Sequence, residues 1–231
     1  MALRLLIDSA DPQSWSELWP LGMFAGITTN PTLLQRAGLP CTLSLLKELS
    51  CAASALGCGE LQLQAWGASP DDLLACAKAL LALAPGRIVV KLPLTQAGLL
   101  AARPLIAAGE RVTLTACFGV PQVLAAAALG CTYVAPYLGR ISRNGRDGCA
   151  EVMAMQQCLS GVGSATRLLV ASLRSTQEII RLAAAGIDTF TLAPSLAREL
   201  WMDADTEAAV AQFEAETRGP LPEGSAVTPL A

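Results

Sequence analysis

The 231-residue chain contains no histidine. This absence excludes serine–histidine and cysteine–histidine nucleophile pairs, zinc motifs of the H-E-x-x-H kind and any histidine general base. Catalysis by this chain would have to use lysine, arginine, carboxylate, amide, hydroxyl or phenol groups.

Charged residues are scarce: they make up 15% of the chain, against 53% hydrophobic residues, and the net charge is −3. The apolar content supports a large core and argues against disorder. The weakly acidic balance gives no indication of a nucleic-acid partner or of a basic membrane-surface patch. No apolar run reaches the roughly 18 residues that span a bilayer, and Asp8 interrupts the apolar start too early for a signal peptide. We expect a cytoplasmic protein that binds neither nucleic acid nor membrane.

The eight cysteines form no C-x-x-C pair and are scattered through apolar segments. This pattern predicts small buried side chains in a reducing compartment, and neither disulfides nor a metal site.

The chain also lacks a glycine-rich phosphate loop of the G-x-G-x-x-G or Walker A kind, which doubly wound sheets usually carry. Short apolar runs predict strands over 3–8, 24–30, 60–66, 87–93, 111–117, 132–138, 167–173 and 188–193. Helical spacing predicts helices over 43–56, 69–83, 95–108, 121–129, 151–159, 175–185, 194–201 and 206–217, with a polar loop over 140–148. Eight alternating units in one α/β domain favour a single (β/α)₈ TIM barrel. We expect residues 1–218 to form the barrel with a C-terminal helical extension, and residues 219–231 to form a mobile tail.

Lys91 ends the fourth predicted strand, an apolar run bounded by Pro85-Gly86 and Pro93. A strand of a parallel sheet is covered on both faces, so a lysine at its carboxyl end is costly to bury in the charged form. Burial favours the neutral amine, which is a nucleophile toward carbonyls. The alternative is that Lys91 only ends the strand and points its ammonium group into water.

Polar residues follow the other predicted strands as well, and in a barrel the carboxyl ends of all strands meet on one face. They are Asp8, Thr28, Thr29, Asn30, Gln64, Thr115, Tyr137, Arg140, Ser172 and Arg174. Together with Lys91 they suit a Schiff base with a sugar ketone whose other end carries a phosphate. Each also has a structural alternative: Asp8 and the Thr28–Asn30 segment could cap helices, Tyr137 could belong to the core, and the arginines could be solvated.

Several of these residues lie in longer motifs that resemble the small-subunit transaldolase family. The motifs are Gly-Ile-Thr-Thr-Asn-Pro-Thr at 26–32, Val-Val-Lys-Leu-Pro-Leu-Thr at 89–95, Tyr-Val-Ala-Pro-Tyr-Leu-Gly-Arg-Ile at 133–141 and Val-Ala-Ser-Leu-Arg at 170–174. The resemblance covers nearly the whole chain and implies a TIM barrel, a mechanism without metal or cofactor, a sugar-phosphate substrate and a homo-oligomer, a pentamer or decamer. It also implies a role for each matching residue. Lys91 would form the Schiff base, Asp8 would transfer the proton, Thr28 and Asn30 would line the dihydroxyacetone pocket, and Arg140, Ser172 and Arg174 would bind phosphate.

Two positions favour the fructose-6-phosphate aldolase branch of this family. Gln64 and Tyr137 stand where transaldolases proper tend to carry glutamate and phenylalanine. A tyrosine hydroxyl, with Gln64 and Thr115 holding a water, could protonate the enamine and so lead to net cleavage. The segment Gly139-Arg140-Ile141 is more similar to transaldolases, so transfer of a dihydroxyacetone unit stays open. A third possibility is a sugar-phosphate-binding barrel without catalysis, which the presence of both Lys91 and Asp8 disfavours.

Overall fold

Eight parallel strands form the centre of the structure, a computed structural model that describes residues 2–217. The strands are β1 Arg4–Asp8, β2 Phe24–Thr28, β3 Leu61–Gln64, β4 Ile88–Pro93, β5 Val112–Cys117, β6 Tyr133–Pro136, β7 Arg167–Leu168 and β8 Thr189–Leu192. Their order in the sheet is β7-β6-β5-β4-β3-β2-β1-β8. Val170 closes the ring between the two ends, since its N–H donates to Thr189 and its carbonyl accepts from Thr191, both at 3.0 Å. The predicted TIM barrel is thereby confirmed.

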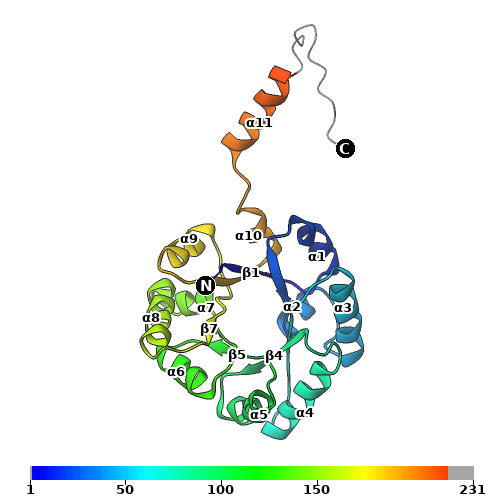
Figure 1. The fold of residues 1–231 in the computed structure, drawn as a ribbon, viewed down its shortest axis with the longest axis vertical. Helices are drawn as coiled ribbons and strands as arrows, with labels where there is room; N and C mark the ends of the chain where they lie inside the picture. Colours follow the sequence, from blue (N-terminus) through cyan, green and yellow to red (C-terminus); the bar gives the residue numbers. More distant parts are fainter. Residues whose placement is uncertain (1, 218–231) are drawn as a thin grey trace. The chain divides into compact units, whose positions relative to one another are not determined.

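Helices surround the strands on the outside of the ring (Figure 1). They are α1 Pro12–Leu18, the 3₁₀ turn η1 Trp19–Leu21, α2 Pro31–Arg36, α3 Leu43–Ala55, α4 Pro70–Leu81, α5 Gln96–Ala107, α6 Val120–Leu129, α7 Leu138–Arg143, α8 Gly148–Gly161, α9 Thr176–Ala184 and α10 Pro194–Arg198. A further helix, α11 Ala204–Thr217, follows in the chain. Many of these helices begin with an N-cap residue whose polar side chain accepts a hydrogen bond from a backbone N–H of the first turn. Ser69 and Asp72 form a capping box at the start of α4, where Pro70 fixes the first turn.

The chain divides into two units, the barrel up to Ala197 and a second unit that begins at Arg198. The second unit contains α11, none of whose residues is buried. The tail predicted over 219–231 lies outside the described residues. None of the helices within residues 2–217 combines the length and the apolar composition needed to cross a bilayer.

Several segments differ from the prediction. The helix α2 over Pro31–Arg36 was not predicted. The expected loop over 140–148 begins as α7, because Leu138 and Ile141 are buried one helical turn apart while arginines occupy the outer positions. The regular ladder of β7 is shorter than the predicted 167–173, although its hydrogen bonds continue to Ala171. Ser172 then takes a left-handed conformation with φ 63°, which a strand cannot continue.

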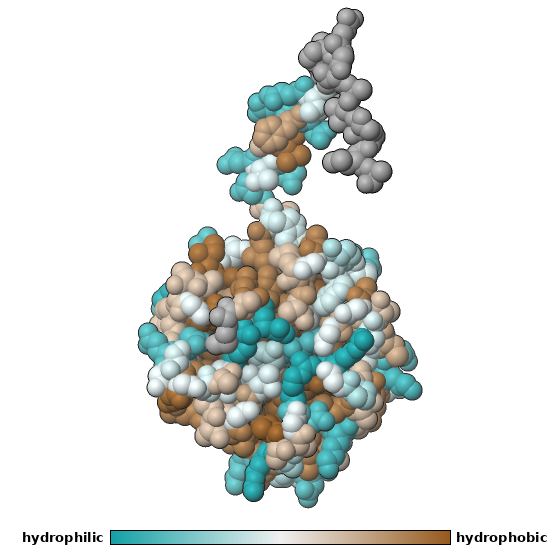
Figure 2. All heavy atoms as spheres, viewed as in Figure 1, coloured by the Kyte–Doolittle hydropathy of each residue, from teal (hydrophilic) through white to brown (hydrophobic). Residues whose placement is uncertain are grey.

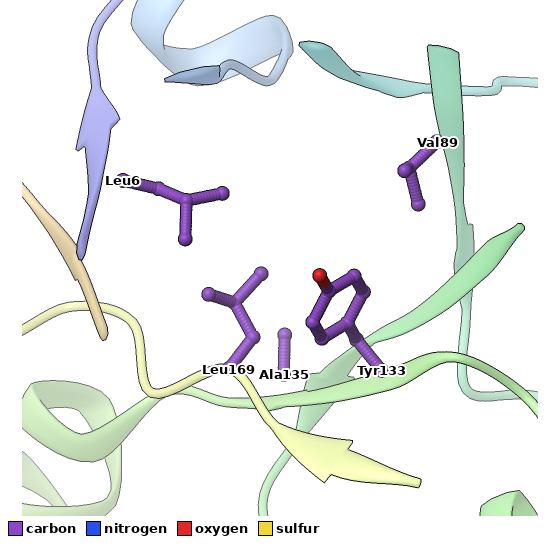
Figure 3. Close-up of a cluster of buried hydrophobic side chains, with 5 residues drawn as sticks. All are labelled: Leu6, Val89, Tyr133, Ala135 and Leu169. Carbon is purple, nitrogen blue, oxygen red and sulfur yellow. The ribbon is translucent and has the colours of Figure 1, made fainter. Parts of the chain in front are cut away.

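The barrel interior has layers of different chemistry. Leu6, Val89, Tyr133, Ala135 and Leu169 form an apolar layer, and Figure 3 shows them pointing toward one another from the surrounding strands. On its amino side the buried Glu60 carboxylate accepts hydrogen bonds from Arg4, Arg111, Tyr133 and Gln62 at 2.9–3.1 Å. On its carboxyl side the partly buried Tyr137 packs against the layer. Figure 2 shows one end of the barrel, with hydrophilic residues at its middle.

Four of the cysteines, Cys58, Cys117, Cys131 and Cys149, are buried, as predicted, and all eight are free thiols. Cys41 and Cys51 are exposed, which corrects the prediction for these two positions.

Candidate active site

A cavity of about 450 Å³ opens at the carboxyl ends of the strands. Side chains alternate between the two faces of a strand, so Asp8 shares the inward face of β1 with Leu6, and Lys91 that of β4 with Val89. Seven of the ten residues with a predicted role line this cavity: Asp8, Asn30, Lys91, Tyr137, Arg140, Ser172 and Arg174. The convergence that the sequence predicted is therefore present in the fold.

Lys91 is buried, with 4% of its surface exposed, although it lines the cavity. Its Nζ donates to the carbonyl of Thr29 at 3.2 Å, at the end of β2. β4 pairs with β3 and β5 on either side, and this pairing fixes the lysine backbone. The amine thus lies at the floor of the cavity rather than in bulk water.

Asp8 faces the same cavity from β1. The Thr28 hydroxyl donates to its Oδ1 at 2.7 Å, and Thr191 in turn lies 2.5 Å from the Thr28 hydroxyl. Burial raises the pKa of Asp8 above its ordinary value of 3.8, while the charge of Lys91, the Thr28 hydrogen bond and the charge of Arg36 lower it. A carboxyl group whose pKa moves toward neutrality is a better proton acceptor than an ordinary aspartate.

Tyr137 follows β6 directly and lines the cavity with its half-buried side chain. Its hydroxyl lies 2.8 Å from the hydroxyl of Thr115 on β5. Phe118 packs edge-on against the ring, and the Arg140 guanidinium lies over the ring face, 4.9 Å from its centroid. These contacts hold the phenol in one place, and Arg140 with it.

Three predicted site residues, Thr28, Gln64 and Thr115, lie behind the cavity wall. Thr28 and Thr115 do not line the cavity themselves, but they form hydrogen bonds with Asp8 and Tyr137, which do. Gln64 donates its amide to the carbonyls of Lys91 and Ala65, at 3.2 and 3.1 Å. It therefore supports the backbone at the lysine.

The wall formed by α7 and the loop after β7 depends on one glycine. The Gly139 N–H donates to the Ser172 carbonyl at 3.0 Å, and a Cβ on Gly139 would collide with that same carbonyl. Ser172 itself has φ 63°, a conformation that L-residues rarely adopt. This close approach brings Arg140 on α7 and Arg174 on the loop to one side of the cavity.

The sequence prediction missed Arg36, Arg143 and Thr191, which also line the cavity. Arg36 ends α2, whose start is visible in the sequence: Asn30 accepts from the Leu33 N–H at 3.1 Å, and Pro31 follows it. This cap signal could have placed Arg36 near the strand ends. Arg143 lay in the segment that was predicted as a loop.

A larger hollow of about 690 Å³ lies elsewhere, between the ends of α6 and α8. Its lining is mainly apolar, and Arg167, which it includes, is paired with Asp188 at 2.9 Å. It brings together none of the predicted site residues, so size alone does not identify the site.

Comparison with known families agrees with this geometry. Residues 5–225 match the family described as Transaldolase/Fructose-6-phosphate aldolase. The chain belongs to this transaldolase/aldolase family. Curated relatives include a "Probable transaldolase" of Cereibacter sphaeroides (strain ATCC 17025 / ATH 2.4.3), 31% identical, with 93% of this chain and 95% of that protein covered. A "Probable transaldolase" of Lactiplantibacillus plantarum is also 31% identical, over 93% of this chain and 96% of that protein.

A solved structure supports the fold of this family member. The chain titled "Crystal structure of a putative phosphonomutase from Burkholderia cenocepacia J2315" matches with a TM-score of 0.60, over 92% of this chain and 94% of that one. At 16% identity this likeness concerns the barrel alone. Membership of the transaldolase/aldolase family makes the chain an enzyme.

Proposed function

We propose that the protein is a class I aldolase that cleaves fructose 6-phosphate to dihydroxyacetone and glyceraldehyde 3-phosphate, and forms it in reverse. The observation that carries the proposal is the 2.8 Å contact between the Tyr137 and Thr115 hydroxyls at the cavity that also holds Lys91 and Asp8. A positioned phenol beside the lysine provides a proton donor for net cleavage.

In the proposed reaction the Lys91 amine attacks the C2 ketone, and loss of water gives an iminium. Asp8 then accepts the proton of the C4 hydroxyl as the C3–C4 bond breaks. The bond electrons move into the iminium and leave an enamine on Lys91, while glyceraldehyde 3-phosphate departs. The raised pKa of the buried Asp8 carboxyl supports its role as the base.

The enamine must be protonated at C3 before water can hydrolyse the iminium and release dihydroxyacetone. We assign this proton to the Tyr137 hydroxyl, which the Thr115 hydroxyl contacts at 2.8 Å. The water that attacks the iminium gives a proton back to the Tyr137 phenolate. Asp8 releases the C4 hydroxyl proton, which balances the proton taken up when the iminium formed. The water consumed in hydrolysis replaces the water lost when the iminium formed, so the reaction balances.

The phosphate of the substrate would bind at the wall formed by Arg140, Ser172 and Arg174. Arg140 is held over the Tyr137 ring at 4.9 Å, so its guanidinium is already ordered before substrate binds. An ordered guanidinium binds a phosphate with less loss of side-chain entropy.

Transaldolase activity is the second candidate, in which the enamine waits for an acceptor aldose phosphate. The curated relatives carry the name transaldolase, which favours this alternative. Gly139-Arg140-Ile141, which is more similar to transaldolases, favours it as well.

The test compares cleavage of fructose 6-phosphate with transfer of its three-carbon unit to erythrose 4-phosphate, in the unmutated protein and in Tyr137→Phe. We expect the substitution to lower cleavage by about 10²-fold, the range for a positioned general acid, and to spare transfer. Tyr133→Phe is the matched control, because Tyr133 is the other tyrosine and bonds to Glu60 below the apolar layer. An unmutated protein that transfers much faster than it cleaves would make it a transaldolase.

A further inference from the structure

Two buried hydroxyl groups form a chain of hydrogen bonds that ends at the Asp8 carboxylate. The Thr28 hydroxyl donates to Oδ1 of Asp8 at 2.7 Å, and the Thr191 hydroxyl lies 2.5 Å from that of Thr28. Thr28 and Thr191 have 0% and 2% of their surface exposed. Thr191 had no predicted role, yet it lines the cavity beside Asp8.

The direction of each bond in this chain follows from the number of protons. A threonine hydroxyl has one proton to donate and two lone pairs that accept. Thr28 gives its proton to the Asp8 carboxylate, which only accepts while it is ionised. The contact with Thr191 therefore has Thr191 as donor and Thr28 as acceptor. A donor at the head of such a chain polarises the next hydroxyl and strengthens its bond.

The closed ring of strands brings the three side chains together. Asp8 and Thr28 are opposite each other in the β1–β2 ladder. Thr191 is on β8, the other neighbour of β1, and is paired there with Leu6. On its far side the Thr191 N–H donates to the Val170 carbonyl at 3.0 Å, where the ring closes. The backbone of Thr191 is thus fixed on both sides.

The chain engages one oxygen of the Asp8 carboxylate. Within residues 2–217 the hydrogen bond from Thr28 to Oδ1 is the one that this carboxylate accepts. Oδ2 stays available to the cavity that Asp8 lines. A carboxylate that is held through one oxygen presents the other in a defined direction, as a base in bond cleavage requires.

We propose that Thr191 is a positioning residue, which acts through Thr28 to orient the Asp8 carboxylate and to hold it in the form that accepts the C4 hydroxyl proton. This inference rests on the proposed function, in which Asp8 is the base. It applies to cleavage and to transfer alike, because the C3–C4 bond breaks first in both.

The acid limb of the pH profile can report on this chain. Burial raises the pKa of Asp8, while Lys91 on β4, the Thr28 hydrogen bond and Arg36 on α2 lower it. The other ionisable side chains that line the cavity are Tyr137, Arg140, Arg143 and Arg174. A substitution at Thr191 leaves all of these groups in the protein and removes only the donor to Thr28. Its loss should weaken the Thr28 bond and raise the pKa of Asp8.

The test measures kcat, KM and the pH profile of fructose 6-phosphate turnover in the full chain, Thr191→Val, Thr191→Ser and the control Thr189→Val. Thr189 is buried on the same face of β8, but its hydroxyl bonds to Asp188 and Arg167. We expect Thr191→Val to lower kcat and kcat/KM alike, by about threefold to tenfold, and to move the acid limb to higher pH. Thr191→Ser, which keeps the hydroxyl, should restore most of the activity, and Thr189→Val should change neither readout.

A double variant separates action through Thr28 from direct contact with the substrate. If Thr191 acts through Thr28, adding Thr191→Val to Thr28→Val lowers kcat no further and leaves the acid limb in place. Borohydride trapping of dihydroxyacetone on Lys91 should persist in Thr191→Val and shows that the barrel is folded. Thr191→Ala, which also lacks the hydroxyl, gives the same comparison where the valine variant does not fold.

Two outcomes would overturn the inference and leave the proposed function standing. Thr191→Val could leave kcat and the acid limb unchanged, or its effects could add to those of Thr28→Val in the double variant. An unmutated protein that forms no borohydride adduct and turns over no ketose would overturn the proposed function and this inference together.

Discussion

Lys91 differs from the other two lysines in its surroundings. Lys47 and Lys78 are exposed on α3 and α4, whereas Lys91 lines the cavity from a buried strand. We predict that Lys91→Met abolishes covalent trapping of dihydroxyacetone by borohydride, because Lys91 is the one lysine among the residues that line the cavity with Asp8. Intact mass shows the reduced adduct in the unmutated protein and its loss in the variant. Lys78→Met is the control, and an adduct that persists in Lys91→Met would refute the assignment.

In the proposed mechanism, Asp8 sets the acid side of the pH dependence of kcat/KM. Burial raises its pKa above 3.8, and the Thr28 hydrogen bond opposes this shift. The active form is the carboxylate, so kcat/KM falls as the pH drops through the raised pKa. Thr28→Val removes the opposing hydrogen bond and is predicted to move this acid limb to higher pH. A pH profile of kcat/KM checks it, and a limb at 3.8 or below, or one that Thr28→Val leaves in place, contradicts the prediction.

The sequence was sufficient to predict the cavity residues at the ends of clearly apolar strands. It was insufficient to predict the cavity residues on short helices. Lys91 and Asp8 could be placed because the strand before each is a clear apolar run, and strand ends meet on one face. Arg36 and Arg143 end six-residue helices whose few apolar positions give little periodicity. Gln64 was predicted at the right strand end, but a sequence does not show that its amide turns to the Lys91 carbonyl.

At the scale of elements, the strand and helix pattern followed from apolar periodicity and from proline and glycine boundaries. The exceptions are local: α2 was not predicted, α7 was predicted as a loop, and β7 pairs less regularly than its apolar run suggests. The last two lie at the wall where Gly139 contacts Ser172. This contact joins residues 33 positions apart in the chain, so local propensity does not reveal it.

The close contact between α5 and β4 is predicted to contribute to the stability of the barrel. Gly98 is buried in the first turn of α5, and a Cβ there would collide with the carbonyl of Pro93 at the end of the strand that carries Lys91. We predict that Gly98→Ala lowers the free energy of unfolding by about 1–3 kcal/mol, because backbone must move. Gly161→Ala is the matched control in α8, where nothing lies within 4 Å of the added Cβ. There the higher helix propensity of alanine should stabilise the protein by up to about 1 kcal/mol.

Chemical denaturation of the two variants measures these changes. Equal effects of the two substitutions would mean that α5 can shift away from β4 at little cost.

At the scale of the whole molecule, the barrel interior has the Glu60 network at one end and the candidate site at the other. The apolar layer around Leu6 and Val89 lies between the Glu60 network and the cavity. The sequence predicted that polar residues converge at the cavity end, where they follow strands. It did not predict the Glu60 network, because a glutamate that precedes a strand usually lies in solvent. Its partners Arg4 and Tyr133 come from β1 and β6, and Arg111 directly precedes β5, so the ring of strands brings them together.

Glu60 is predicted to stabilise the closed ring through its two ion pairs. Its carboxylate is 3% exposed and pairs with Arg4 at 3.0 Å and Arg111 at 2.9 Å, whose side chains are 29% and 35% exposed. Glu60→Ala removes the carboxylate partner of both guanidiniums, although Arg111 keeps its hydrogen bonds to the Gly86 and Arg87 carbonyls. We predict a loss of about 3 kcal/mol in the free energy of unfolding. Glu151→Ala is the control, since it breaks an exposed pair with Arg146 and should cost less than about 1 kcal/mol.

Urea denaturation at fixed protein concentration compares the two variants. Because Glu60 lies across the apolar layer from Lys91, Glu60→Ala should still form the borohydride adduct under conditions where it is folded. Equal stability losses in the two variants would show that the Glu60 network adds no more than a surface ion pair. A stable Glu60→Ala protein that no longer forms the adduct would show that the two ends of the barrel are coupled, contrary to their separation by the apolar layer.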